Sequence, residues 1–203
     1  MNSPGAAAGD WAELPAATIS DAMGRMGAMH AGITRLSGER VAGRAFTVQT
    51  GAGDNSTIHR AVNAAPPGAV LVIDAEAHLG RAVWGFVLTV AALKRRLAGA
   101  VIDGAVRDID AIRDLGWPLY ARGVCPLGPH KGFEGRVGDA VQCGGVIVAP
   151  GDVVVGDADG VAIVPAERAT QVFARASARM AEEADWVRRI ENGESSLDIL
   201  GIK

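Results

Sequence analysis

The architecture of this chain follows from residues 99–108, which read Gly99-Ala100-Val101-Ile102-Asp103-Gly104-Ala105-Val106-Arg107-Asp108. Residues 100–102 predict a buried strand, Gly104 predicts a tight turn, and residues 109–115 predict a helix. Arg107 and Asp108 are therefore expected where a strand ends and the next helix begins, which is the usual place for ligand binding and catalysis in layered α/β proteins.

Two interpretations of Arg107 and Asp108 remain open at this level. An arginine at a strand–helix junction can bind a carboxylate with two N–H groups, aided by the positive end of the helix. An aspartate beside it is a hard oxygen ligand suited to Mg²⁺ or Mn²⁺. Alternatively, Asp108 only caps the helix and Arg107 pairs with a surface acid.

Composition describes an ordinary globular protein of one domain. The chain has 203 residues, 49% of them hydrophobic and 21% charged, with a net charge of −3. We expect a flexible tail over residues 1–12 and a single domain over residues 13–203. The scattered basic residues argue against nucleic-acid binding. No segment is apolar enough for a membrane span, and no signal peptide is evident, so we expect a cytoplasmic protein in which Cys125 and Cys143 are structural thiols.

Hydrophobic periodicity predicts mixed α/β structure first, then short strands, then one long helix. Helices are expected over residues 14–27, 55–64, 83–97, 109–115 and 167–190, with a loose tail from Asn192. Strands are expected over residues 41–50, 69–73, 100–102, 117–122, 137–141, 145–148, 153–156 and 161–164.

The loop Gly51-Ala52-Gly53-Asp54-Asn55 follows a strand and precedes a helix. Glycine loops in this position bind nucleotides or S-adenosylmethionine, but the third glycine is missing, so a methyltransferase is only weakly indicated. Asn55 and His59 lie four residues apart and share one helical face. Asn55 either reaches a cleft there or caps its helix. His130 and Lys131 stand in a Gly/Pro loop, and we assign neither to catalysis.

Much of the chain resembles one family. The likeness rests on residues 99–108, on Gly116-Trp117-Pro118 and Gly128-Pro129-His130-Lys131-Gly132, on Ser20-Asp21-Ala22-Met23, and on the Pro-Gly-Asp segment from Pro150. It is the family of 4-hydroxy-4-methyl-2-oxoglutarate/4-carboxy-4-hydroxy-2-oxoadipate aldolases, which includes the RraA-type regulators of ribonuclease E. The resemblance implies an α/β/α layered, swivelling-domain-like (RraA-like) fold with a β-rich C-terminal half and a terminal helix.

The resemblance also implies a metal-dependent lyase that releases pyruvate from 4-hydroxy-2-oxo acids by retro-aldol cleavage, with oxaloacetate decarboxylation as a side activity. Asp108 would bind Mg²⁺ or Mn²⁺, and Arg107 would hold the substrate and stabilise the enolate. The substrate carboxylate would meet Asn55 and the backbone N–H groups of Gly85, Phe86, Val87 and Leu88, at a helix N-terminus.

This chain departs from the family at Phe86, where the aldolases have an acid that holds metal-bound water. Losing such an outer partner commonly costs about 10–100-fold in metal affinity or activity. Either another acid substitutes, with Asp103 as the candidate although it more simply supports the turn, or the activity is altered or weak. No residue can be named as the general base from the sequence, and metal-bound water is one candidate for that role.

The long terminal helix predicts an assembly. Val172, Ala176, Arg179, Glu183, Trp186 and Ile190 share one of its faces. The resemblance implies a homotrimer, or a hexamer of paired trimers, in which Glu183 (or else Glu182) enters a neighbour's site as a catalytic residue. An intrahelical pair between Arg179 and Glu183 is the alternative.

A rival function is a non-catalytic protein that binds a partner such as ribonuclease E. The regulator lacks the aspartate after the arginine, so Asp108 favours chemistry, whereas Phe86 favours the rival. The physiological 2-oxo acid substrate is not determined by the sequence.

Overall fold

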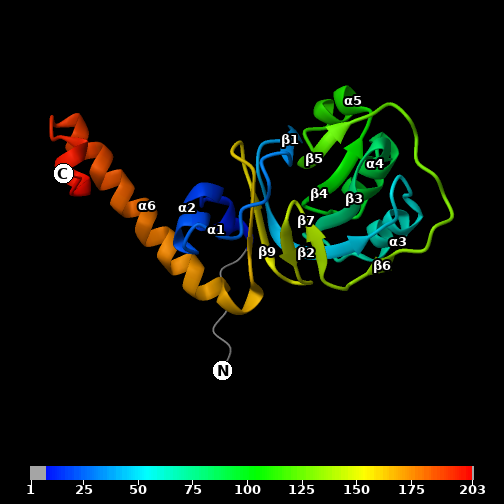
Figure 1. The fold of residues 1–203 in the computed structure, drawn as a ribbon, viewed down its shortest axis with the longest axis horizontal. Coiled ribbons are helices and arrows are strands. Elements are labelled where there is room, and N and C mark those ends of the chain that lie inside the picture. The colour runs from blue at the N-terminus through cyan, green and yellow to red at the C-terminus, as the bar shows by residue number, and fades with distance from the viewer. Residues whose placement is uncertain (1–7, 203) are drawn as a thin grey trace.

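The computed structural model describes residues 8–202 and has the predicted α/β architecture. Figure 1 shows a body of sheet and helices, from which the C-terminal helix α6 projects away from α3, α4 and α5. Among the described residues, no helix is both long and apolar enough to cross a lipid bilayer.

Strands and helices alternate over residues 41–124, between two N-terminal helices with one short strand and a C-terminal part of short strands and helices. The helices are α1 (Ala8–Ala12), α2 (Ala16–Ala22), α3 (Ser56–Ala64), α4 (Phe86–Lys94), α5 (Ile109–Asp114), the 3-10 turn η1 (Ala166–Arg168), α6 (Ala169–Glu191) and α7 (Ser196–Leu200). The strands are β1 (Thr34–Ser37), β2 (Val41–Gln49), β3 (Val70–Trp84), β4 (Gly99–Val106), β5 (Leu119–Val124), β6 (Arg136–Val137), β7 (Val141–Cys143), β8 (Val146–Val148), β9 (Val153–Gly156) and β10 (Val161–Val164).

The main sheet of the described chain has eight strands in the order β1-β5-β4-β3-β2-β9-β10, with β6 also paired to β2. The central strands β2, β3, β4 and β5 are parallel, because helices connect them, whereas β1, β9 and β10 join antiparallel. Strands β7 and β8 form a separate hairpin. The carboxyl ends of β3 and β4 therefore lie side by side and carry the candidate site.

Three apolar clusters hold these layers together. One lies between the parallel strands and helices α3, α4 and α5, and includes Trp84 and Trp117, whose rings stack with centroids 5.5 Å apart. A second lies under the β7–β8 hairpin and contains Cys143. The third joins β9 and β10 to α1, α2 and the first half of α6. Cys143 is buried and Cys125 is half-buried, and both are free thiols.

The predicted turn at Gly104 is wrong, because β4 continues straight through it to Val106. The irregularity lies instead in β3, where Glu76 and Ala77 take left-handed conformations and the register with β4 shifts. A Cβ at Gly104 would lie 2.8 Å from the Cβ of Ala75. Glycine is therefore needed at 104 for close approach to the bulged strand, not for a turn.

The predicted helix over 83–97 is wrong at both ends. Val83 and Trp84 belong to β3, where Trp84 pairs with Val106, and α4 begins only at Phe86 and ends at Lys94. The apolar spacing of Val83 and Trp84 fits a helix as well as a strand, and pairing with β4 decides for the strand. The predicted strand over 137–141 is in fact two strands, β6 and β7. The chain bends between them at Gly138, which has a positive φ of 85°.

Both chain ends hold more structure than predicted. Residues 1–7 of the expected tail lie outside the described residues, but residues 8–12 form α1. Trp11 is buried there and meets Phe173 of α6 edge-on, with ring centroids 5.2 Å apart.

The expected helix over 14–27 is limited to α2, because Gly24, Arg25 and Gly27 all have positive φ. Past Asn192, α7 replaces the expected loose tail.

Candidate functional site

A cavity of about 370 Å³ opens where the end of β3, the start of α4 and the junction of β4 with α5 meet α3 and a loop over residues 128–131. It gathers six of the predicted site residues, namely Asn55, Gly85, Val87, Leu88, Arg107 and Asp108. It adds seven others, namely His59, Ala82, Val83, Trp84, Gly128, Pro129 and Lys131.

Arg107 is held between two glycines from different elements. Its backbone N–H donates to the carbonyl of Trp84 at 2.9 Å, which ties the end of β4 to the end of β3. A Cβ at Gly85 would lie 3.1 Å from Cγ of Arg107, and a Cβ at Gly128 would lie 2.7 Å from Nη1. The two glycines therefore leave a slot that sets the direction of the guanidinium group at the cavity.

Asp108 does not cap its own helix. It is the residue before α5, but its backbone is left-handed (φ 60°) and its side chain accepts no capping bond from α5. Its Oδ2 instead accepts the N–H of Phe86 at 3.1 Å, so this carboxylate caps the neighbouring helix α4. Nε of Arg107 lies 3.6 Å from the same oxygen. The simple capping interpretation is therefore wrong for α5, and the strained backbone aims Asp108 across to α4.

Phe86 contributes its backbone rather than its ring to this arrangement. The ring is partly exposed and does not line the cavity, and the N–H is already used by Asp108. Predicted substrate contact by Phe86 thus finds no support in the geometry. Val87 and Leu88 do line the cavity, in the first turn of α4, where backbone N–H groups lack partners within the helix and favour an anion.

Asn55 faces the cavity from the start of α3. It occupies the position before the helix but makes no capping bond, because Oδ1 of Asp54 accepts the N–H of Ser56 at 2.7 Å instead. Asn55 is only 6% exposed, and its Oδ1 has no hydrogen-bond partner among the described residues. Of the two interpretations left open for Asn55, the structure favours the cleft.

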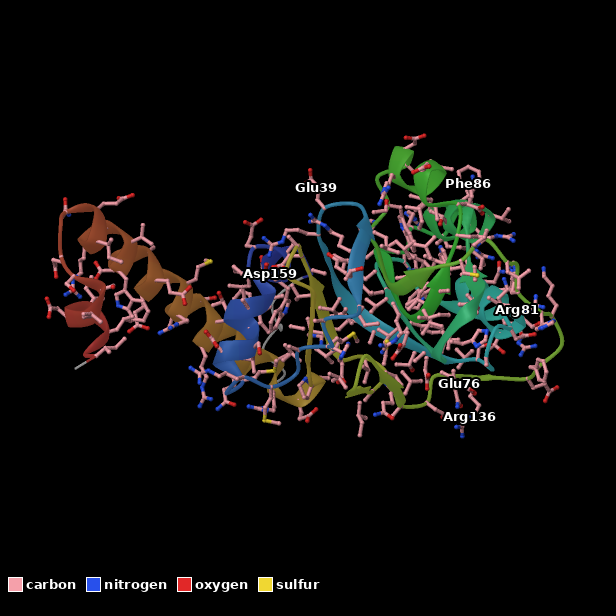
Figure 2. The ribbon with its side chains drawn as sticks, turned by 45° about the horizontal axis from the view of Figure 1, so that its top comes forward. Glu39, Glu76, Arg81, Phe86, Arg136 and Asp159 are labelled. Carbon is pink, nitrogen blue, oxygen red and sulfur yellow. The ribbon has the colours of Figure 1, made fainter. Side chains whose placement is uncertain are left out.

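The loop that carries Lys131 is the part of the site that sequence reasoning missed. The buried carboxylate of Asp54 accepts the N–H of Phe133 at 3.3 Å, and Oγ of Ser56 accepts that of Gly132 at 2.9 Å. Nη1 of Arg81 donates to the carbonyl of Gly128 at 2.9 Å. Figure 2 shows Arg81 and Phe86 on the side of the body away from α6. A signal was present in the sequence, because the glycines and proline around Lys131 predict a rigid polar loop.

The cavity is lined by more positive than negative side chains. Arg107 and Lys131 face a single carboxylate, that of Asp108. His59, one helical turn after Asn55, also lines it, and both burial and the nearby charge of Lys131 lower the pKa of its imidazole below the usual 6.5. A neutral imidazole beside two cations and a helix N-terminus suits an anionic ligand.

Asp103 does not replace the missing acid of the site. Its Oδ1 pairs with Nε of Arg122, and its Oδ2 accepts the N–H of Gly144 at 2.7 Å. Side chains alternate along a strand, so Asp103 faces the β7–β8 hairpin on the opposite side of the sheet from the helices. The suggestion that it substitutes for an acid at position 86 is therefore wrong.

Glu183 does not reach the cavity of its own chain. Its Oε1 accepts Nε of Arg179 at 2.9 Å, as in the intrahelical alternative, and Arg179 also lies over the ring of Trp186. Only Ala169, Val172 and Ala176 of α6 are buried. The helix that carries Glu183 lies across the molecule from α4 (Figure 1).

Comparison with known proteins identifies the family of the chain. The model of the RraA-like family (Aldolase/RraA) matches residues 16–163. A protein of Halalkalibacterium halodurans named "Putative 4-hydroxy-4-methyl-2-oxoglutarate aldolase" is 36% identical over 180 residues, which cover 88% of this chain and 86% of that protein.

Two solved structures share the fold. A protein from Pseudomonas syringae pv. tomato, described as uncharacterized, superposes with a TM-score of 0.86 at 28% identity, covering 100% of this chain and 98% of that one. The RNA-processing inhibitor RraA from Thermus thermophilis superposes with a TM-score of 0.69 at 29% identity, covering 74% and 92%. The chain therefore belongs to the RraA-like family of aldolases and RraA proteins.

Proposed function

We propose that this protein is a divalent-metal-dependent lyase that cleaves 4-hydroxy-2-oxo acids, of the 4-hydroxy-4-methyl-2-oxoglutarate or 4-carboxy-4-hydroxy-2-oxoadipate type, to pyruvate, and that also decarboxylates oxaloacetate. The observation that carries the proposal is Arg107, held between Gly85 and Gly128 in a cavity beside the carboxylate of Asp108. The relative from Halalkalibacterium halodurans supports the aldolase assignment by its name.

Both reactions pass through the same anion. Cleavage of the C3–C4 bond and loss of CO₂ each leave an electron pair that is stabilised as a pyruvate enolate. Arg107 can stabilise the developing negative charge on the C2 oxygen, because its guanidinium group is fixed before the charge appears. The first-turn N–H groups of Val87 and Leu88, together with Lys131, can bind substrate carboxylates.

A hydrated Mg²⁺ or Mn²⁺ ion fits the donor set, although with few protein ligands. Among the described residues no cluster of three histidine, cysteine or acidic side chains could hold a metal. Mg²⁺ commonly keeps several waters and is bound through one or two carboxylates. Asp108 supplies one, with Oδ2 already shared with the N–H of Phe86. Such a cation would polarise the C2 carbonyl group as a Lewis acid.

Homotrimers or hexamers are part of the proposal, because Glu183 can act only on a neighbouring chain's site. Beyond Ala176 no side chain of α6 is fully buried, and Ile190 is exposed there. The family match ends at residue 163, before α6 begins. The proposed role of Glu183 thus concerns a helix outside the matched residues, and it rests on the exposure of α6 and on the resemblance.

The first experiment is a coupled assay. Purified protein is incubated with oxaloacetate or 4-hydroxy-4-methyl-2-oxoglutarate and Mg²⁺, and pyruvate is detected with lactate dehydrogenase and NADH. We expect pyruvate from both substrates and none after chelation of the metal. Full turnover after metal stripping contradicts the metal requirement, and no turnover with either substrate contradicts the lyase.

Regulation of a partner such as ribonuclease E is the second candidate. It is favoured by Phe86, which stands where the aldolases have an acid, and by the structural likeness to the RNA-processing inhibitor RraA. Absence of pyruvate formation, together with inhibition of ribonuclease E by the purified protein, would favour this function over the lyase.

A further inference from the structure

We propose that His59 is the general base that removes the C4 hydroxyl proton in the retro-aldol reaction. This inference rests on the proposed lyase function and adds the residue that abstracts the proton. The imidazole lines the same cavity as Arg107 and Asp108 but comes from another element, the second turn of α3.

The position of His59 suits the far end of the substrate. When C1 and C2 lie at Arg107, Asp108 and the start of α4, C4 is two bonds further along the chain, toward another wall of the cavity. That wall is formed by Asn55, His59 and Lys131. Lys131 can bind the carboxylate carried by C4, and Oδ1 of Asn55, buried without a partner among the described residues, can accept a hydrogen bond from the substrate.

The proton and electron changes balance without a further reactant. The neutral imidazole takes the hydroxyl proton, the C4–O bond becomes a carbonyl, and the C3–C4 bond breaks. Its electron pair forms the enolate of pyruvate, whose C3 then takes a proton from the imidazolium or from water. A neutral imidazole can perform this task, and general base catalysis typically contributes about 10²–10⁴-fold.

The surroundings of His59 keep its imidazole unprotonated before the reaction begins. The charged groups that line the cavity with it are Lys131 on the loop, and Arg107 and Asp108 at the β4–α5 junction. Partial burial lowers the pKa of the His59 imidazole, and the positive charge of Lys131 lowers it further, so the neutral form that can take the hydroxyl proton is favoured.

Oxaloacetate provides the test, because its decarboxylation forms the same enolate without removing a hydroxyl proton. We expect His59→Gln and His59→Asn to lower kcat for 4-hydroxy-4-methyl-2-oxoglutarate cleavage by ~10² fold or more. Oxaloacetate decarboxylation by the same variants should stay within about twofold, since stabilisation of the enolate by Arg107 is unchanged. Arg107→Ala should lose both activities.

His130→Gln is the matched control, because His130 is exposed on the same loop as Lys131 and its side chain does not line the cavity. It should leave both activities near wild type. His59→Ala gives a second measurement, since added imidazole should restore its cleavage activity but leave decarboxylation unchanged. Thermal melts establish that each variant is folded.

Three results would overturn the inference. Equal loss of both reactions in folded His59 variants would show a positioning role, and retention of both would show no role in proton transfer. Failure of imidazole to restore cleavage by folded His59→Ala would also count against a base. A wild-type protein inactive with both substrates would instead overturn the lyase itself, and the base with it.

Discussion

The carboxylate of Asp108 accepts the backbone N–H of Phe86 at 3.1 Å, so the start of α4 and the start of α5 are joined at the candidate site. The hydrogen bond brings position 86 next to the proposed cation ligand although 22 residues separate the two in sequence. A side chain at 86 therefore begins beside the proposed cation ligand, and this position gives the first prediction.

Phe86→Asp should strengthen Mg²⁺ or Mn²⁺ binding by about 10–100-fold and raise turnover, because it adds an acid that can hold metal-bound water. An acid in the first turn of α4 is also favourable to the helix, so folding should be preserved. Titration calorimetry and the coupled assay measure the two effects. Leu93→Asp, an exposed change near the other end of α4, should leave both unchanged. No gain in a folded Phe86→Asp protein would mean that the pocket serves another ligand.

Asp108→Asn should abolish metal-dependent turnover, with a loss larger than the ~10–100-fold seen when only an outer partner is removed. Asparagine tolerates the left-handed backbone at this position and can still accept the N–H of Phe86, so the melting temperature should change little. Steady-state assays across a Mg²⁺ series provide the readout. Near-normal rates would reduce Asp108 to a cap of α4.

Gly85→Ala should cost ~10² fold in kcat/KM, because its Cβ would lie 2.6 Å from Oδ2 of Asp108 and force the carboxylate to move. Gly51→Ala is the matched control, since the nearest atom to its new Cβ is a side-chain carbon of Phe133 at 3.6 Å, an ordinary contact. Kinetics of the two variants, with melts for both, separate displacement of the site from loss of stability. Equal activity in the two variants would contradict a fixed Asp108.

Stability should depend on pH through His59. Its folded pKa lies below the unfolded value of about 6.5, so the unfolded chain binds the proton more readily. The stabilising contribution is therefore complete above pH 6.5 and is lost as the pH falls through the folded pKa. Thermal melts of wild type and His59→Gln between pH 5 and 7.5 should show a smaller pH slope for the variant. Parallel curves would argue against the lowered pKa.

Light scattering should give a mass of three or six times the 20.8 kDa chain at micromolar concentration. Within the assembly, Glu183 or Glu182 of one chain should approach Arg107 and Asp108 of another. Glu183→Gln should then lower turnover without changing the mass. A 20.8 kDa particle would refute the assembly, whereas a trimer with both glutamates in solvent would refute only the shared site.

Local sequence patterns determined many of the elements. Strands over 153–156 and 161–164 and helices close to 56–64 and 109–114 follow from apolar periodicity bounded by glycine, proline and polar residues. The same patterns placed Arg107 and Asp108 at a strand–helix junction, because a buried run followed by a helical period leaves few other arrangements. Where the apolar spacing fits both periods, as at Val83 and Trp84, only pairing with Val106 decided for a strand.

The tertiary structure alone decided which segments meet at the site. Lys131 joins Asn55 and His59 because Asp54 ties its loop to the start of α3, and Gly128 approaches Arg107 because Arg81 holds the carbonyl of Gly128. These contacts join residues far apart in the chain, by single hydrogen bonds or by a close approach that only glycine allows. Local periodicity carries no information about such long-range contacts, which depend on the order and bulges of the parallel strands.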